Sequence, residues 1–318
     1  DDEPSELLTD AQESALAGLK ASSTNLSLSL DWLSTAGGSG GDDIVNAVAT
    51  DSAGNAIVTG SVSYNVTLGT LQVSAPSGTS GFVAKLSPFG YWIWAIALVG
   101  GSSNIVAIDV DSNGMIYIVG NTYDQVSAGA YTLGSSGSEG FFVAKVNPQG
   151  AWVWAKPVVT SGSWWSEVTD VTVDDNGNTA IVGHFSSTIT IGSHSLSSNG
   201  GTDIFVAKLN SGGTNWLWAK TFGGVNYDYG NAIDTWEIGT GYEGECNSHL
   251  NNIVITGAFT EYIEFGDYNF STARYNSSAY VTWICGDDGG VFSSIAEGVP
   301  ASSSSLIEQW YSSSDFST

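Results

Sequence analysis

A motif of about fourteen residues occurs three times in this chain and constrains its fold more than any other feature. The copies are FVAKLSPFGYWIWA (82–95), FVAKVNPQGAWVWA (142–155) and FVAKLNSGGTNWLWA (205–219), and they begin 60 and 63 residues apart. A repeat of this length is typically one supersecondary unit that buries its apolar surface against neighbouring copies. We therefore expect a modular fold built from stacked units.

Each copy contains four apolar segments of strand length, rich in β-branched and aromatic residues. In the second copy these are VAIDVD (106–111), MIYIVGNT (115–122), FVAK (142–145) and WVWA (152–155). The motifs DSAGN, DSNGM and DDNGN, at 51–55, 111–115 and 174–178, join the first segment to the second. They predict tight hairpin turns, because Asp bonds to its own backbone and Gly adopts positive φ.

A fourth, looser copy follows the three regular ones. It contains NNIVITG (251–257), AYVTWIC (279–285) and VFSSIAEGV (291–299), and the segment EIGTGYEGECNSHL (237–250) lengthens its first turn. Between the second and third strands lies a variable piece that predicts an extra short hairpin, for example TITIGSHSL (188–196).

The repeated units predict an all-β fold, a β-propeller of about four four-stranded antiparallel blades. In the FVAK strand, the side chains that point to one face and those that point to the other are both largely apolar. A blade packed between two other blades requires this. We expect the paired tryptophans of the last strand, such as Trp216 and Trp218, to share one face and wedge between adjacent blades.

The segment DIFVAKLNSGGTNWLWAKTFGGVNYDYGNAI (203–233), with the D-x-x-G-N turns and IVTGS, resembles the SBBP-type β-propeller repeat. The resemblance covers about residues 31–299. It implies a propeller fold and a secreted or cell-surface location in bacteria or archaea, and it implies no catalytic residues. The fourth copy departs from the pattern, because Trp283 stands where Lys is expected.

We predict an N-terminal extension over 1–27, the propeller over 28–299 and a Ser-rich C-terminal tail over 300–318. The repeats would span about 31–90, 91–150, 151–213 and 214–299.

Five segments resemble the last strand of a repeat, whereas the first, second and third strands each occur four times. The additional segment is LSLDWLSTA (28–36). Either a terminal blade has a fifth strand, or 28–36 closes the ring in place of 291–299, or one terminal strand completes a neighbouring molecule. In the last case Leu28, Leu30 and Trp32 would belong to the donor strand.

The chain has 32 acidic residues but only seven Lys and Arg, for a net charge of −25. A cation-poor surface repels nucleic acid and anionic lipid, so neither is an expected partner. No apolar run has the length of a membrane helix. These properties suit a secreted, extracellular or cell-surface protein.

Two cysteines and four sequons fit that location. Cys246, in the long loop, and Cys285, after the third strand of the same copy, would lie at one end of the blade, which predicts a disulfide. Candidate N-glycosylation sites are Asn25, Asn65, Asn269 and Asn276.

Other motifs have both a functional and a structural interpretation. Lys85, Lys145 and Lys208 could form a cationic ring, but we expect each ammonium to meet a local carboxylate. The Asp-Gly turns and the acidic loop are weak calcium candidates, and no other metal or cofactor is expected. Glu261 and Glu264 could serve a glycosidase, but such pairs are usually solvated. Trp164 and Trp165, outside the repeat pattern, are the candidate ligand contacts.

The sequence therefore predicts a non-enzymatic extracellular structural protein, such as a filament or surface-layer subunit that polymerises with itself by terminal strand exchange. The alternative is a carbohydrate-binding adhesin with glycan partners. A propeller glycosidase or lyase is the third hypothesis.

Overall fold

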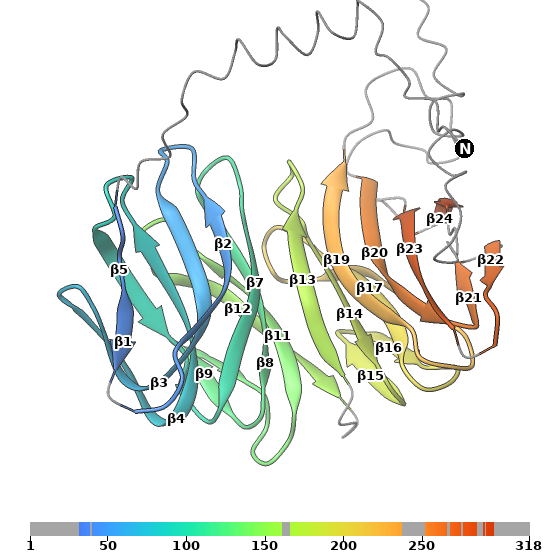
Figure 1. Cartoon of the computed structure of the whole chain (residues 1–318), viewed down its shortest axis with the longest axis horizontal. Coiled ribbons are helices and arrows are strands. Elements are labelled where there is room, and N and C mark those ends of the chain that lie inside the picture. The colour runs from blue at the N-terminus through green and yellow to red at the C-terminus, as the bar shows by residue number, and fades with distance from the viewer. Residues whose placement is uncertain are drawn as a thin grey trace, which may run out of the picture. The chain divides into compact units, whose positions relative to one another are not determined.

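The computed structural model describes residues 32–38, 40–160, 166–236, 252–265, 268–274, 276–284, 289 and 291–295. All regular secondary structure in these ranges is β-strand (Figure 1). Residues 34–318 form one compact unit, to which every described strand belongs, and residues 1–33 form another. None of the described residues forms a helix with the length and apolar character that a membrane span needs.

Four antiparallel sheets share one strand order, in which each strand pairs with the next main strand along the chain. Sheet 1 consists of β2 (Ile44–Thr50), β3 (Ala56–Leu68), β4 (Leu71–Leu86) and β5 (Trp92–Ala97). Sheet 2 consists of β7 (Ser103–Val110), β8 (Ile116–Thr122), β11 (Gly140–Val146) and β12 (Trp152–Thr160).

The second half of the unit repeats this order. Sheet 3 consists of β13 (Glu167–Val173), β14 (Thr179–Phe185), β17 (Asp203–Leu209) and β18 (Trp216–Phe222). Sheet 4 consists of β19 (Tyr229–Trp236), β20 (Asn252–Thr260), β23 (Ser277–Ile284) and β24 (Val291–Ile295). The predicted four-strand repeat is confirmed, including a last strand in the irregular fourth copy.

The predicted extra hairpins between the second and third strands are also present. They are β9 (Val126–Ala128) with β10 (Tyr131–Leu133), β15 (Thr188–Ile191) with β16 (His194–Ser197), and β21 (Tyr262–Phe265) with β22 (Tyr268–Ser271). In sheet 1 the corresponding residues extend β3 and β4 instead. Two further short strands are present. β1 (Ala36–Gly38) pairs with β3, and β6 (Val99–Gly100) pairs with β9.

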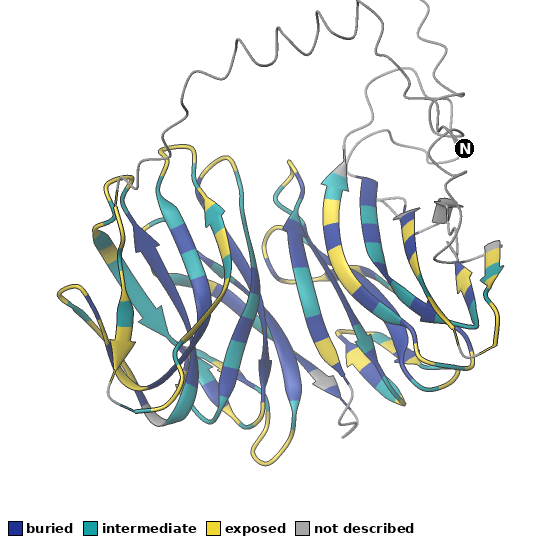
Figure 2. Ribbon diagram, viewed as in Figure 1, coloured by how far each residue is buried: buried dark blue, intermediate teal, exposed yellow. Residues whose placement is uncertain are grey.

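Neighbouring sheets pack face to face in chain order and bury one apolar cluster at each of three junctions. The first junction, between sheets 1 and 2, buries Val83 and Phe142; the second buries Val143 and Phe205. Strands β8 and β17 are buried along their whole length, as Figure 2 shows. A sheet that is covered on both faces needs apolar residues at successive positions, which explains the FVAK strand.

The tryptophan pair does not share one face, contrary to our prediction. A β-bulge shifts the register between Lys208 and Leu209, so that Trp218 lies opposite the first and Trp216 opposite the second. Trp216 therefore joins the cluster of the second junction and Trp218 that of the third. An extra residue in one strand reverses the alternation of side chains, which the sequence pattern alone does not reveal.

The tryptophans Trp154 and Trp94 of the last strands each pack where a glycine of the next sheet leaves room for the indole. A Cβ added to Gly213, in the turn between β17 and β18, would lie 2.5 Å from the Trp154 ring of the preceding sheet. Gly150 has the same relation to Trp94, at 2.8 Å. Glycine at this turn therefore allows the indole of one sheet to lie against the backbone of the next.

The all-β antiparallel fold is confirmed, but a closed propeller is not. Among the described strands, no strand of sheet 1 pairs with a strand of sheet 4. Sheets 1 and 4 lie at the two ends of the row in Figure 1. The predicted domain boundaries stay predictions, and the N-terminal extension and C-terminal tail lie outside the described residues.

We predict that Gly213→Ala destabilises the chain by about 2 kcal/mol, because a left-handed backbone is unfavourable for Ala and its methyl group meets Trp154. The matched control is Gly212→Ala, since a Cβ at Gly212 has no neighbour closer than 3.8 Å and its φ is not positive. Urea unfolding of both variants checks this, and equal loss in the two would refute the role of the indole.

Candidate functional site

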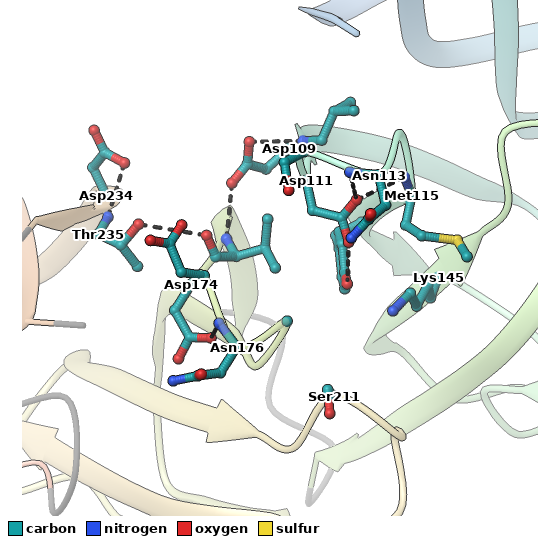
Figure 3. Close-up of a pocket in the computed structure, with 16 residues that line it drawn as sticks. Asp109, Asp111, Asn113, Met115, Lys145, Asp174, Asn176, Ser211, Asp234 and Thr235 are labelled. Carbon is teal, nitrogen blue, oxygen red and sulfur yellow. Dashed lines mark hydrogen bonds between the residues drawn. The ribbon is translucent and has the colours of Figure 1, made fainter. Parts of the chain in front are cut away.

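A cleft lies where the turns of sheets 2 and 3 approach the end of β19 (Figure 3). It has a volume of about 480 Å³, and carboxylates and amides dominate its lining. Its labelled residues include Asp109, Asp111, Lys145, Asp174 and Asp234. An acidic cleft of this size can accept hydroxyl groups or cations, so the engagement of each carboxylate decides what is left for a ligand.

The first aspartate of each turn organises that turn, as predicted. Asp174 Oδ1 accepts hydrogen bonds from the backbone N–H groups of Asn176 and Asn178, at 2.9 and 2.8 Å. Asp111 Oδ1 does the same for Asn113 and Met115. The glycine of each turn has positive φ. The turn geometry accounts for these aspartates without a bound cation.

Two of the three repeated lysines are ion-paired to these same turns. Lys208 Nζ lies 2.9 Å from Asp174 Oδ2, and Lys85 Nζ lies 2.8 Å from Asp51 Oδ2. Burial raises the pKa of Asp51, but hydrogen bonds from Lys85 and Asn55 outweigh it and lower the value to about 2. The interpretation of these lysines as local structural partners is confirmed at both positions.

Lys145 differs because a tyrosine takes its place at the carboxylate. The Tyr117 hydroxyl donates to Asp111 Oδ2 at 3.1 Å, and the Lys145 ammonium lies 4.7 Å from the centre of the Tyr117 ring. Burial lowers the pKa of Lys145, and the charge of Asp111 opposes that effect. Burial and Asp111 both raise the pKa of Tyr117 above its usual range, so the phenol stays protonated.

Two further aspartates join the innermost strands of neighbouring sheets. Asp109 accepts from the N–H of Val110 through Oδ1, at 2.7 Å, and from the N–H of Val173 in the next sheet through Oδ2, at 2.8 Å. Asp170 bonds in the same way to Ile233 of sheet 4, at 2.9 Å. Each carboxylate therefore fixes the alignment of two sheets.

Most acids of the cleft thus serve the protein's own backbone. Among the residues that the structure describes, no group of three or more His, Cys, Asp and Glu side chains is arranged to hold a metal ion. Glu261 and Glu264 accept hydrogen bonds from Asn226 and Tyr262 respectively, and Glu264 is exposed on the β21–β22 hairpin. The cleft gives no ground for assigning a reaction.

The remaining predicted site residues are only partly described. Cys246, Cys285, Trp164, Trp165, Asn25, Leu28 and Leu30 lie outside the described residues. The candidate glycosylation sites Asn65, Asn269 and Asn276 are all exposed. The disulfide, the ligand contacts and glycosylation therefore stay predictions.

The short strand β1 reveals a relation that sequence spacing missed. The last strands of sheets 1 and 2 continue onto the hairpin of the following repeat, where Val99 pairs with Ser127 and Val159 with Thr190. An isolated bridge joins Gly223 to Glu264 in the same way. In β1, Gly37 pairs with Thr67 of β3, at the equivalent position. β1 therefore occupies the place of a last strand belonging to a sheet ahead of sheet 1.

This register changes the correspondence of Trp32. The second tryptophan of a last strand precedes the pairing residue by five positions, as Trp94 precedes Val99 and Trp218 precedes Gly223. Trp32 precedes Gly37 by the same five positions. Trp32 is thus equivalent to Trp94. A constant spacing of 60 residues would align Trp32 with Trp92 instead, but two extra residues follow β1.

Buried acids also lie at the junction of sheets 3 and 4. Asp228 accepts from the N–H groups of Gly224 and Thr260, at 2.7 and 3.2 Å, and burial, with a smaller effect of Asp203, raises its pKa to about 7. Burial raises the pKa of Asp203 to about 6, although one of its oxygens accepts from Asn199. These groups favour the folded chain at acidic pH.

Comparisons with known proteins do not identify a family. No protein-family model matches the chain, and a comparison with curated proteins finds no match. Among solved structures, one similar chain is a protein of unknown function from Bacteroides caccae, with 12% identity over 80% of this chain and 81% of that chain and a TM-score of 0.33. Another is the Vibrio cholerae biofilm matrix protein Bap1, with 8% identity over 79% and 61% and a TM-score of 0.19. Neither similarity is high enough to carry an argument.

We predict that Lys208→Met destabilises the chain by about 3 kcal/mol, because it leaves the Asp174 carboxylate buried without its cation. Lys145→Met is the matched comparison at the equivalent position, and its expected loss is about 1 kcal/mol, since it removes a cation–π contact. Chemical denaturation at pH 7 measures both. Equal losses would contradict the distinction between the two sites.

We also predict a pH-dependent contribution from Asp228. Its pKa is 3.8 in a model compound and about 7 in the fold, so its unfavourable effect is absent below pH 4, grows between pH 4 and 7 and is complete above that. Asp228→Asn should therefore gain stability relative to the parent chain, on the order of 3 kcal/mol, as pH rises from 4 to 7. Unfolding titrations at both pH values test this, and a constant difference would contradict it.

Proposed function

We propose that this chain is a non-enzymatic, extracellular structural protein of the SBBP propeller type, whose copies assemble by exchanging the strand around residues 28–38. The four sheets would act as propeller blades, with the exchanged strand as the last strand of a neighbour's fourth blade. The observation that carries the proposal is the register of β1, which pairs with β3 at the position where β6 pairs with β9 in the next repeat.

The segment 28–38 would fit as the last strand of sheet 4, a position that β24 of the same chain occupies. β24 pairs with β23, with Ser293 opposite Trp283. In the other sheets a tryptophan stands there, as Trp94 does opposite Lys85 and Trp218 opposite Lys208. A strand containing Trp32 restores the missing indole, which favours replacement of β24 by the segment 28–38 of another copy.

The composition supports an extracellular location and an absence of nucleic acid and membrane partners. Seven cations and 32 acids give a surface with few attractive sites for polyanions. The structural role is favoured over catalysis or glycan binding, because Asp109, Asp111 and Asp174 of the cleft accept hydrogen bonds from turns and neighbouring strands.

We predict that Trp32→Ala weakens self-association by about 30-fold or more, since a buried interface tryptophan contributes about 2 kcal/mol or more. Leu33→Ala is the matched control, because Ala95 and Ala219 occupy the equivalent position in sheets 1 and 3. Sedimentation velocity and electron microscopy of the full chain provide the measurement. A parent chain that stays monomeric across concentration and pH would contradict the proposed function.

A further inference from the structure

At each end of the row of sheets, one apolar residue is exposed whose equivalents inside the row are buried or, for Ile108 of sheet 2, partly buried. Val48 of β2 is 63% exposed, whereas the equivalent Val171 and Ile233 are 3% and 6% exposed. At the other end Val281 of β23 is 47% exposed, whereas the equivalent Val143 is fully buried. Figure 2 shows exposed residues along β2 and β23.

These positions lie on two different and complementary faces. Val171 and Ile233 each face the preceding sheet, in the clusters of the second and third junctions. Val143 faces the following sheet, in the cluster of the second junction.

The face of sheet 1 that contains Val48 therefore corresponds to the face that receives a preceding sheet, and it is exposed along β2, whereas Phe82 and Ala84 on the same face are buried in a cluster formed within sheet 1. The face of sheet 4 that contains Val281 corresponds to the face that receives a following sheet.

The polar groups along the innermost strands repeat this complementarity. Asp234 accepts from the N–H of Thr235 at 2.8 Å, as Asp109 accepts from that of Val110. Asp109 uses its second oxygen for Val173 of the next sheet, and Thr50 is the equivalent of Val173 in sheet 1. Asp234 is thus arranged to accept from the N–H of Thr50 in a sheet that follows sheet 4.

We propose that the open face of sheet 4 in one copy docks on the open face of sheet 1 in a second copy, as a fourth junction of the same kind. The inference rests on the proposed function, because a strand 28–38 in the neighbour's fourth sheet continues into β1 and so brings that sheet onto sheet 1. To the proposed function it adds the two docking faces, which contain Val48 and Val281, and a hydrogen bond from the N–H of Thr50 to Asp234 as a polar link between them.

A second copy covers both faces without altering the observed junctions. Sheets 1 and 4 lie at opposite ends of the row, so closure within one chain would require the sheets to rotate against each other. The contact joins two different surfaces, and it therefore propagates head to tail into a filament or closes a larger ring.

The test uses one charged substitution on each face of the full-length chain, Val48→Asp and Val281→Asp. Both residues are about half exposed or more in the single copy, so each variant should fold. Each variant alone is expected to lose association by at least about 100-fold, because a carboxylate would be buried at the contact. An equimolar mixture should form a dimer and nothing larger, since each dimer then has one intact pair of faces.

Leu217→Asp is the control, because Leu217 is 44% exposed on β18 and lies on neither end face. It should assemble like the parent chain in sedimentation velocity. If both single variants assemble normally while Trp32→Ala does not, strand exchange stands and face docking is wrong. If the parent is monomeric and Val48→Asp only lowers its stability, the faces meet within one chain. Both results overturn the inference, and only the second also removes the proposed function.

Discussion

Burial of both faces of each sheet is the constraint on which the structure depends. A four-stranded sheet with apolar residues at successive positions, such as Phe141, Phe142 and Val143, cannot leave either face in water. Each junction buries one face of two sheets, so a row of four sheets has one face at each end without a neighbouring sheet; in sheet 1 the residues of β3 and β4 on that face bury one another, and β2 is left exposed. The exposure of Val48 and Val281 follows from the number of sheets rather than from any local peculiarity.

Polar groups give these apolar junctions a defined alignment. Aspartates on the innermost strands accept an N–H from their own strand and one from the next, which fixes the register between sheets. At the turns, Asp51 and Asp174 combine backbone bonds with a buried lysine. With a net charge of −25, copies of the chain repel one another at long range, so attraction between them must come from apolar burial at short range.

The sequence predicted the strand order, the Asp-Gly turns, the extra hairpins and the carboxylate partners of Lys85 and Lys208, but not the position of Lys145 over the Tyr117 ring. It failed where one residue changes the geometry. The bulge between Lys208 and Leu209 moves Trp216 and Trp218 to opposite faces, although their spacing suggests a shared one. The equivalence of Trp32 with Trp94 depends on the pairing of Gly37 with Thr67, which no local pattern encodes.

The acids of the cleft show the same limit of sequence analysis for candidate functional residues. The aspartates of its turns were weak calcium candidates, but they accept hydrogen bonds from the backbone N–H groups of their own turns. The bond from Val173 to Asp109 becomes visible only when the sheets are stacked. Asp234 differs, because it repeats the arrangement of Asp109 in the sheet after which no further sheet is described. A carboxylate that occurs at the same position in sheets 2 and 4, and that in sheet 4 faces no further sheet among the described residues, links the fold to the proposed assembly.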